Sequence, residues 1–190
     1  MRRFWFVRHG ESVANAEGWL AGFHDADLTP RGVSQARALR AELAGIRPDR
    51  LVASDLTRAR RTAELGFPHA APGLECHEGL RERNVGAWER VPMRSLRDQG
   101  HMNTLLTWEG RPPGGESQRD LAARVLAWLA AHDDGRETMA FVHGGLIRVV
   151  VGLLDGTPVD QIGRWKVPNV EVVARDVPSS RWAELLEALP

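Results

Sequence analysis

The stretch FWFVRHG (residues 4–10) is an apolar run that ends in a histidine and a glycine. A second stretch, MAFVHGG (residues 139–145), has the same form near the other end of the chain. Each reads as a short buried strand that breaks at its glycine, so each carries a histidine to the edge of a sheet. Open α/β sheets place their chemistry at the ends of strands, and the sequence therefore predicts a site that contains His9 and His143.

Arginine residues accompany these histidines. Arg8 directly precedes His9, and Arg58 lies in a helical segment at residues 55–63, just after a third apolar strand at residues 50–54. A planar guanidinium matches the oxygens of a phosphate with paired hydrogen bonds and keeps its charge near neutral pH. A metal site would instead need carboxylates or thiolates among the histidines, and the arginines would repel the ion. These residues indicate a phosphate site without a metal.

The composition limits the class of protein. The chain has 190 residues, enough for one domain with a sizeable core, and no linker-like tract divides it, so we expect a single domain over residues 1–190. Its 25 basic and 25 acidic residues cancel, which argues against general binding to nucleic acid or to an anionic membrane. The one cysteine, Cys76, excludes an internal disulfide and is expected to be a small buried side chain.

Targeting segments are not expected. The apolar stretch at residues 4–7 is far shorter than the hydrophobic part of a signal peptide, which has about 7–15 residues. No later segment approaches the roughly 18 apolar residues of a membrane span. We therefore expect a soluble, cytoplasmic protein, in a reducing compartment that suits a single free cysteine.

Strand and helix patterns alternate along the chain. After the first run and a loop at residues 10–29, further strands are expected at residues 50–53, 74–76, 137–142 and 170–175. Helices are expected from the Thr29-Pro30 pair onward, at residues 55–65, 117–132 and 145–154, and as a short helix at 92–99. Such alternation is typical of a doubly wound α/β fold.

Short motifs in a fixed order extend this pattern. They lie at residues 7–12 with Asn15, 28–32, 54–59, 80–82 with Gly86 and Glu89, 113–117 and 143–145. In this order and spacing they resemble the histidine phosphatase superfamily, also called the phosphoglycerate mutase-like family, over most of the chain. The resemblance implies a three-layer α/β/α fold whose central sheet is mixed and mostly parallel, with one antiparallel strand. Members more often end in a strand, whereas residues 182–189 could form a short helix, so the tail is left open.

The resemblance also implies roles for the site residues. His9 would attack phosphorus and form a phosphohistidine, which requires a neutral imidazole with a free lone pair. Neighbouring arginine charges favour the neutral form, while a bound phosphate favours the charged one. The phosphate oxygens would be bound by four matched side chains and one backbone amide, those of Arg8, Asn15, Arg58 and His143 and of Gly144.

Two glutamates are candidates for proton transfer. Glu82 matches the family's proton donor, which protonates the leaving oxygen and then accepts a proton from water. Glu89 is the alternative, and the resemblance treats it as structural. Arg90 replaces the glycine that usually follows this glutamate in the family, so the resemblance does not predict the backbone conformation at this position.

Substrate specificity is expected to come from a cover region at residues 84–112 together with the loop at residues 19–24. Phe23 and His24 lie in that loop and are candidates for substrate contact. Three arginines in or beside the cover region could meet a second anionic group, namely Arg83, Arg94 and Arg111.

The resemblance favours hydrolysis of a small-molecule phosphomonoester, with no cofactor. The mutases of the family carry a longer insertion after the Glu82 motif that this chain does not show, and residues 111–117 resemble the phosphatase branches. A cofactor-dependent phosphoglycerate mutase, a protein phosphatase and a phosphate-binding regulatory module without catalysis are the alternative hypotheses. An apolar edge strand or helix face could support a homodimer.

Overall fold

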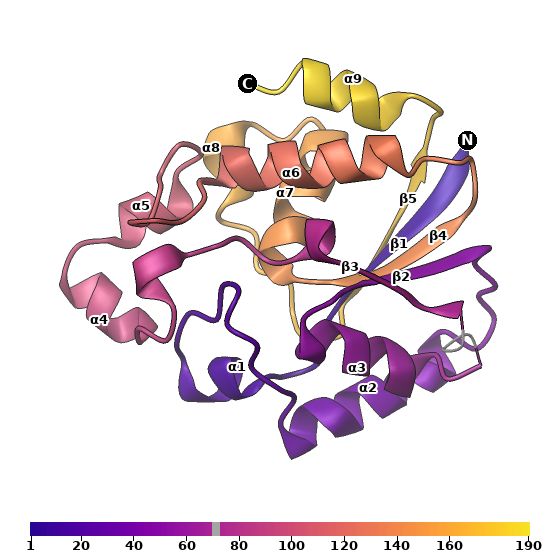
Figure 1. Cartoon of the computed structure of the whole chain (residues 1–190), viewed down its shortest axis with the longest axis horizontal. Coiled ribbons are helices and arrows are strands. Elements are labelled where there is room, and N and C mark those ends of the chain that lie inside the picture. The colour runs from indigo at the N-terminus through magenta and orange to yellow at the C-terminus, as the bar shows by residue number, and fades with distance from the viewer. Residues whose placement is uncertain (70–72) are drawn as a thin grey trace.

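A five-stranded sheet forms the centre of the molecule (Figure 1). The computed structural model describes residues 1–69 and 73–190. In chain order the strands are β1 (Arg2–Arg8), β2 (Arg50–Ser54), β3 (Glu75–His77), β4 (Thr138–Val142) and β5 (Val172–Val177). They lie in the order β3-β2-β4-β1-β5, and β5 alone pairs in the antiparallel direction. The prediction of a mixed, mostly parallel sheet is confirmed.

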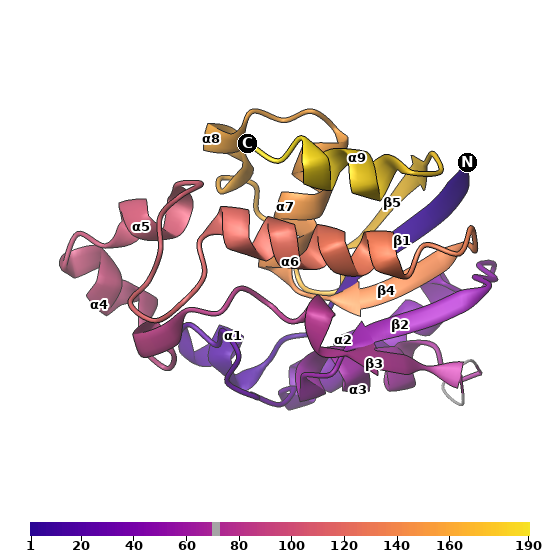
Figure 2. The same cartoon turned by 45° about the horizontal axis from the view of Figure 1, so that its top comes forward.

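Helices cover both faces of the sheet, which gives three layers (Figure 2). One face carries α2 (Pro30–Glu42) and α3 (Thr57–Gly66). The other carries α6 (Gln118–Ala131), α7 (Gly144–Leu154) and α9 (Arg181–Glu187). Successive side chains of a strand point to opposite faces. Both faces of β1 are therefore buried: Phe4 and Phe6 join the core under α6, α7 and α9, and Trp5 and Val7 join the core under α2 and α3.

Side-chain caps define the starts of two long helices. Thr29 accepts a hydrogen bond from the Gly32 amide at 3.0 Å, and Pro30 takes the first position of α2. At α6, Ser117 and Asp120 bond reciprocally in a capping box. Both helices start where the sequence predicts them.

Short elements connect the layers. They are α1 (Val13–Glu17), the 3-10 turns η2 (Glu78–Leu80) and η3 (Gly86–Trp88), α4 (Met93–Asp98), α5 (Met102–Leu106) and α8 (Val159–Ile162). The predicted helix at 92–99 is α4, whereas α5 and α8 were not predicted. Figures 1 and 2 show α4 and α5 together at one end of the molecule, so the cover region is partly helical.

The start of the last strand and the exposure of Cys76 differ from the prediction, and the conformation of the tail, which the sequence left open, is now defined. The last strand begins at Val172 and not at residue 170, because Val170 has a φ of 58°, outside the extended region. The tail is the helix α9, whose Trp182 is fully buried. Cys76 is exposed and not buried, since it lies on β3, a short strand at the edge of the sheet.

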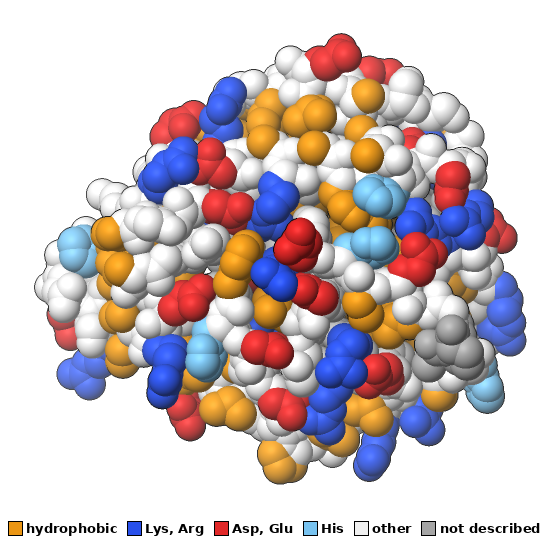
Figure 3. Space-filling model, viewed as in Figure 1, with side chains coloured by type: hydrophobic (Ala, Val, Ile, Leu, Met, Phe, Trp, Pro, Cys, Tyr) orange, Lys and Arg blue, Asp and Glu red, His pale blue; other side chains and the backbone are white. Residues whose placement is uncertain are grey.

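The surface mixes charges of both signs. On the face shown in Figure 3, basic and acidic side chains alternate over short distances, as expected from the balanced composition. Within residues 1–69 and 73–190, no helix combines the length and the hydrophobicity needed to cross a membrane.

Candidate active site

The carboxyl ends of β1 and β4 meet at one edge of the sheet. The two strands pair in parallel with Arg8 opposite Val142, so the residues that follow, His9 and His143, lie side by side with ring centroids 5.2 Å apart. A cavity of about 160 Å³ opens beside them. Its polar lining includes Arg8, His9, Ser12, Asn15, Arg58, Glu82, Arg83, Gln118 and Arg148. The fold thus brings together residues that are far apart in the sequence.

His9 is held as a neutral imidazole. It is only 4% exposed, and its Nδ1 lies 2.7 Å from the Gly10 carbonyl oxygen. Because a carbonyl can only accept, Nδ1 carries the proton and Nε2 keeps its lone pair. Burial, with the charges of Arg58 and Arg8, holds the pKa of His9 well below its ordinary value. Without a bound anion, burial and the arginine charges therefore favour the neutral form, in which His9 can act as a nucleophile.

His143 is a second buried, neutral imidazole. Neither of its ring nitrogens has a hydrogen-bond partner among the described residues. Its pKa also lies well below the ordinary value, because of burial first and then the positive charge of Arg58. A neutral imidazole has one donor and one acceptor. His143 is not among the residues that line the cavity, but it lies beside His9, and both of its ring nitrogens lack a partner among the described residues.

Two guanidinium groups supply positive charge. Arg58, in the first turn of α3, donates from Nη1 to the His24 carbonyl and from Nη2 to the Gly22 carbonyl, both at 2.9 Å. Arg8 donates from Nη1 to the Val167 carbonyl, and its buried Nε has no partner in the described part of the chain. Burial lowers the pKa of both groups. Because the ordinary pKa of a guanidinium is very high, both groups remain charged. They form a fixed pair of cations at the cavity.

Glu82 is anchored at the start of α7. Its Oε2 accepts a hydrogen bond from the Gly145 amide, and its Oε1 accepts one from the Arg83 amide, both at 2.9 Å. A Cβ atom at position 145 would collide with Glu82 Oε1, so the close approach requires glycine there. The N-terminus of a helix is also a favourable place for a carboxylate. Glu82 is therefore held at the cavity wall.

Glu89 is not among the residues that line the cavity. Its Oε1 accepts a hydrogen bond from the Phe23 amide at 2.7 Å and so ties the loop at residues 19–24 to η3. Arg90 follows with a φ of 63°, in the left-handed region that glycine favours, and its amide bonds to the Leu20 carbonyl at 2.8 Å. The backbone at Arg90 therefore keeps a glycine-like conformation despite the larger side chain.

Asn15 lines the cavity, while Gly144 stands next to it. The Asn15 Oδ1 accepts bonds from the Ser12 amide and from Asn169 Nδ2, both at 3.2 Å. These bonds leave the Asn15 amide nitrogen as its remaining donor. Gly144 is the first residue of α7, and its neighbour Gly145 lines the cavity.

Phe23 and His24 are not among the residues that line the cavity. The Phe23 ring lies against the guanidinium groups of Arg81 and Arg124, at 5.3 and 5.5 Å. The His24 ring packs edge-on against Trp19, which does line the cavity. Both residues support the wall, and the His24 carbonyl positions Arg58.

Two polar lining residues were missed by the sequence reasoning. Arg148 lies one helical turn after Gly145, on the same face of α7, and this spacing from the HGG motif could have indicated it. Gln118 lies at the start of α6, and its Nε2 donates to three carbonyls in residues 105–107. No sequence signal indicates Gln118, because its position depends on the unpredicted helix α5.

The three arginines considered for a second anionic group lie in different surroundings. Arg83 is 8% exposed and lines the cavity. Arg94 and Arg111 are outside it, where they pair with Asp98 at 3.8 Å and with Asp120 at 2.7 Å.

Known proteins share both the sequence pattern and the fold. Residues 4–187 match the sequence profile of the histidine phosphatase superfamily (branch 1). A probable phosphoglycerate mutase GpmB of Salmonella paratyphi C (strain RKS4594) is 31% identical over 189 residues, covering 96% of this chain and 88% of its own length.

Two solved structures are similar over almost the whole chain. A mycobacterial glucosyl-3-phosphoglycerate phosphatase in complex with VO3 gives a TM-score of 0.82 at 27% identity and covers 92% of both chains. An alpha-ribazole phosphatase from Shigella flexneri gives a TM-score of 0.81 at 27% identity, over 93% of this chain and 91% of that one.

Proposed function

Because the chain belongs to the histidine phosphatase superfamily (branch 1), we propose that it hydrolyses a phosphomonoester of a small metabolite through a phosphohistidine intermediate. The observation that carries the proposal is the neutral His9, whose Nε2 lone pair is free beside two fixed cations, Arg8 and Arg58. An uncharged nucleophile can attack phosphorus while the cations attract the phosphoryl oxygens.

The first step transfers the phosphoryl group to His9. Its Nε2 bonds to phosphorus as the bond to the ester oxygen breaks. Charge spreads over the other three oxygens, where preorganised donors from Arg8, Arg58 and His143 stabilise it. Glu82 enters this step protonated and gives its proton to the leaving oxygen, while its two bonds to backbone amides hold the side chain at the cavity wall.

The second step releases phosphate. A water molecule attacks phosphorus while Glu82 takes a proton from it, and the bond between His9 and phosphorus breaks. The products are inorganic phosphate, neutral His9 and a protonated Glu82, so one carboxyl group serves both steps.

The size of the cavity supports a small substrate. Its volume of about 160 Å³ is below the roughly 300–1,000 Å³ of sites for drug-sized ligands. Between η3 and α6 the chain forms the short helices α4 and α5 and their loops.

Phosphoglycerate mutase activity is the second candidate, because the relative from Salmonella paratyphi C bears that name. A mutase would share the phosphohistidine and would pass the phosphoryl group to a second hydroxyl instead of water. The two reactions are distinguished by their products.

The test is phosphate release in EDTA from p-nitrophenyl phosphate, α-ribazole phosphate and 3-phosphoglycerate. We expect metal-independent release that disappears in His9→Ala together with acid-labile phosphate labelling. The matched control is His69→Ala, because His69 is exposed and outside the cavity, and it should behave as the unmodified protein. Isomerised 3-phosphoglycerate without release would favour the mutase, and binding without turnover of any ester would favour a regulatory module.

A further inference from the structure

The cavity holds more positive charge than the phosphoryl group alone requires. Besides Arg8 and Arg58, it is lined by Arg83 and Arg148. Arg83 Nη1 and Arg148 Nε are buried and have no hydrogen-bond partner within the described residues. A buried donor atom without a partner is unfavourable, even in a side chain that is half-buried as a whole, as that of Arg148 is. These two donors are therefore expected to meet a group that is absent from the chain itself.

The nearby carboxylates are already engaged. Glu82 bonds to two backbone amides, and Glu116 holds Arg124 through two bonds of 2.8 Å. Neither carboxylate therefore completes the guanidinium of Arg83 or Arg148. By contrast, other arginines near the cavity are paired, as Arg81 is with Asp55.

All four cations line the same cavity. Arg148 is close enough to both Arg8 and Arg83 for its charge to add to the effect of burial in lowering both pKa values. Arg8 lies beside His9 at the end of β1, Arg148 lies on α7, and Arg83 follows η2. Different elements of the fold thus bring positive charge to one cavity.

Gln118 adds a neutral acceptor. Three carbonyl oxygens surround its Nε2, which fixes the orientation of the amide, and its buried Oε1 has no partner among the described residues. An unpaired acceptor of this kind suits a hydroxyl group on a ligand.

We infer that Arg83 and Arg148 bind a second anionic group of the substrate, a carboxylate or a phosphate, on a short hydroxylated skeleton. The inference rests on the proposed function, because it takes the transferred phosphoryl group to lie at His9. Paired guanidinium groups match either anion through charge-assisted hydrogen bonds. The small cavity keeps the two anionic groups within a few bonds of each other.

Three esters with one glycerol skeleton test the inference. In glycerol 3-phosphate the far end is a hydroxyl, in 3-phosphoglycerate it is a carboxylate, and in glycerol 1,3-bisphosphate it is a phosphate. We expect kcat/KM to be about 10- to 100-fold higher for one or both of the esters with a second anionic group than for glycerol 3-phosphate. The gain should come mainly through KM, as for a hydrogen-bonded charge pair. Which ester prevails tells whether the second group is a carboxylate or a phosphate.

Variants then locate the effect. In Arg83→Gln and, independently, in Arg148→Gln, the ratio of kcat/KM for the ester with a second anionic group to that for glycerol 3-phosphate should fall toward one. Two separate variants guard against misfolding of either. The matched control is Arg94→Gln, since Arg94 lies outside the cavity beside Asp98, and it should keep the full preference.

Binding separates this inference from the proposed function. The His9→Ala protein, which should not turn over, is titrated with the three esters by isothermal titration calorimetry. Tighter binding of an ester with a second anionic group, lost on adding Arg83→Gln, supports the second anion site even if the unmodified protein hydrolyses nothing. Equal affinity for all three esters, or a preference that both arginine variants retain, overturns it, whether or not esters are hydrolysed.

Discussion

Glu82 is held by both carboxylate oxygens, and this anchoring gives a test of its role. Replacing Glu82 with Gln removes the transferable proton and places a side-chain amide NH2 group against the backbone N–H of Gly145 or Arg83. For an alkyl phosphate, whose leaving oxygen needs a proton, we expect kcat/KM to fall by about 10²- to 10⁴-fold. For p-nitrophenyl phosphate, whose nitrophenolate leaves without protonation, the fall should be far smaller. Both esters are measured on one preparation.

An equal loss for the two esters would assign proton transfer to Glu89 or to water. Glu89→Gln is the matched variant. Because Glu89 bonds to the Phe23 amide and does not line the cavity, its replacement should not discriminate between leaving groups.

Arg90 carries backbone strain that a single substitution can relieve. Its φ of 63° lies in the left-handed region, which costs a residue with a Cβ roughly 1–2 kcal/mol. Glycine loses this cost and gains flexibility in the unfolded chain, so we expect Arg90→Gly to raise the free energy of unfolding by about 0.5–1 kcal/mol. Urea denaturation measures the change. Arg90→Ala, which keeps the Cβ, should give no such gain, and a gain from alanine would show that the side chain and not the backbone matters.

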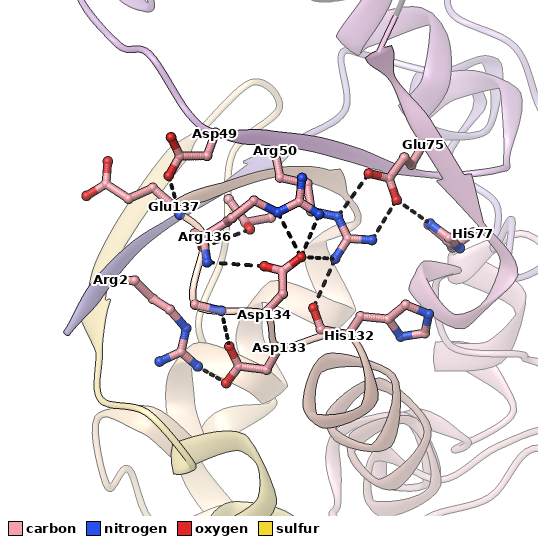
Figure 4. A network of polar contacts seen from close by, with 12 residues as sticks. Arg2, Asp49, Arg50, Glu75, His77, His132, Asp133, Asp134, Arg136 and Glu137 are labelled. Carbon is pink, nitrogen blue, oxygen red and sulfur yellow. Dashed lines mark hydrogen bonds and ion pairs between the residues drawn. The ribbon is translucent and has the colours of Figure 1, made fainter.

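At the scale of secondary-structure elements, Arg50 joins parts of the sheet opposite the site. Figure 4 shows its guanidinium between β3 and the end of α6, where Nη2 bonds to Glu75 Oε2 at 2.6 Å and Nη1 to the His132 carbonyl at 3.0 Å. The side chain is buried, while Glu75 is partly exposed. This network fixes the short edge strand β3, which bonds only to β2 within the described chain.

Removing this guanidinium should loosen β3 first. We expect Arg50→Met to lower the free energy of unfolding by about 1–2 kcal/mol, less than for a fully buried pair because water can solvate Glu75. Hydrogen exchange of the amides of residues 75–77 should rise more than that of β1. The control is Arg47→Met, because Arg47 is exposed and, among the described residues, bonds only to the carbonyls of Ala44 and Ile46. Unchanged protection of β3 would contradict the assigned role of the network.

Elements with strong local signals could be predicted, and short ones could not. The start of α2 follows from Thr29 and Pro30, and the apolar run of β1 marks a strand buried on both faces. The helices α5 and α8 have too few residues to show an apolar period, so packing alone defines them. The late start of the last strand depends on the φ of Val170, which its sequence does not reveal.

The same limit applies to the site. Histidines at strand ends and arginines in motifs could be found from the sequence, because each stands beside a break in a regular pattern. Arg83, Arg148 and Gln118 depend on the way that α5, α6 and α7 meet around the cavity. Their partnerless atoms become visible only once the surrounding hydrogen bonds are known.

For the molecule as a whole, the site lowers stability in acid. His9 and His143 are buried neutral, with pKa values well below the ordinary 6.5 that they regain on unfolding. As the pH falls below 6.5, the unfolded chain therefore takes up protons that the folded chain does not. The free energy of unfolding should then fall, for each histidine by up to about 1.4 kcal/mol per pH unit, until its folded pKa is reached.

Urea denaturation between pH 7.5 and 5 measures this slope. His9→Asn and His143→Asn should each reduce it by up to about 1.4 kcal/mol per pH unit, whatever their effect on stability at pH 7.5. Replacement of the exposed His69 by Asn should leave it unchanged. Asp134, with a pKa of about 2, titrates below this range and does not interfere. A slope that survives both substitutions would mean that the two imidazoles are solvated, and a solvated, protonated His9 could not serve as the nucleophile in mild acid.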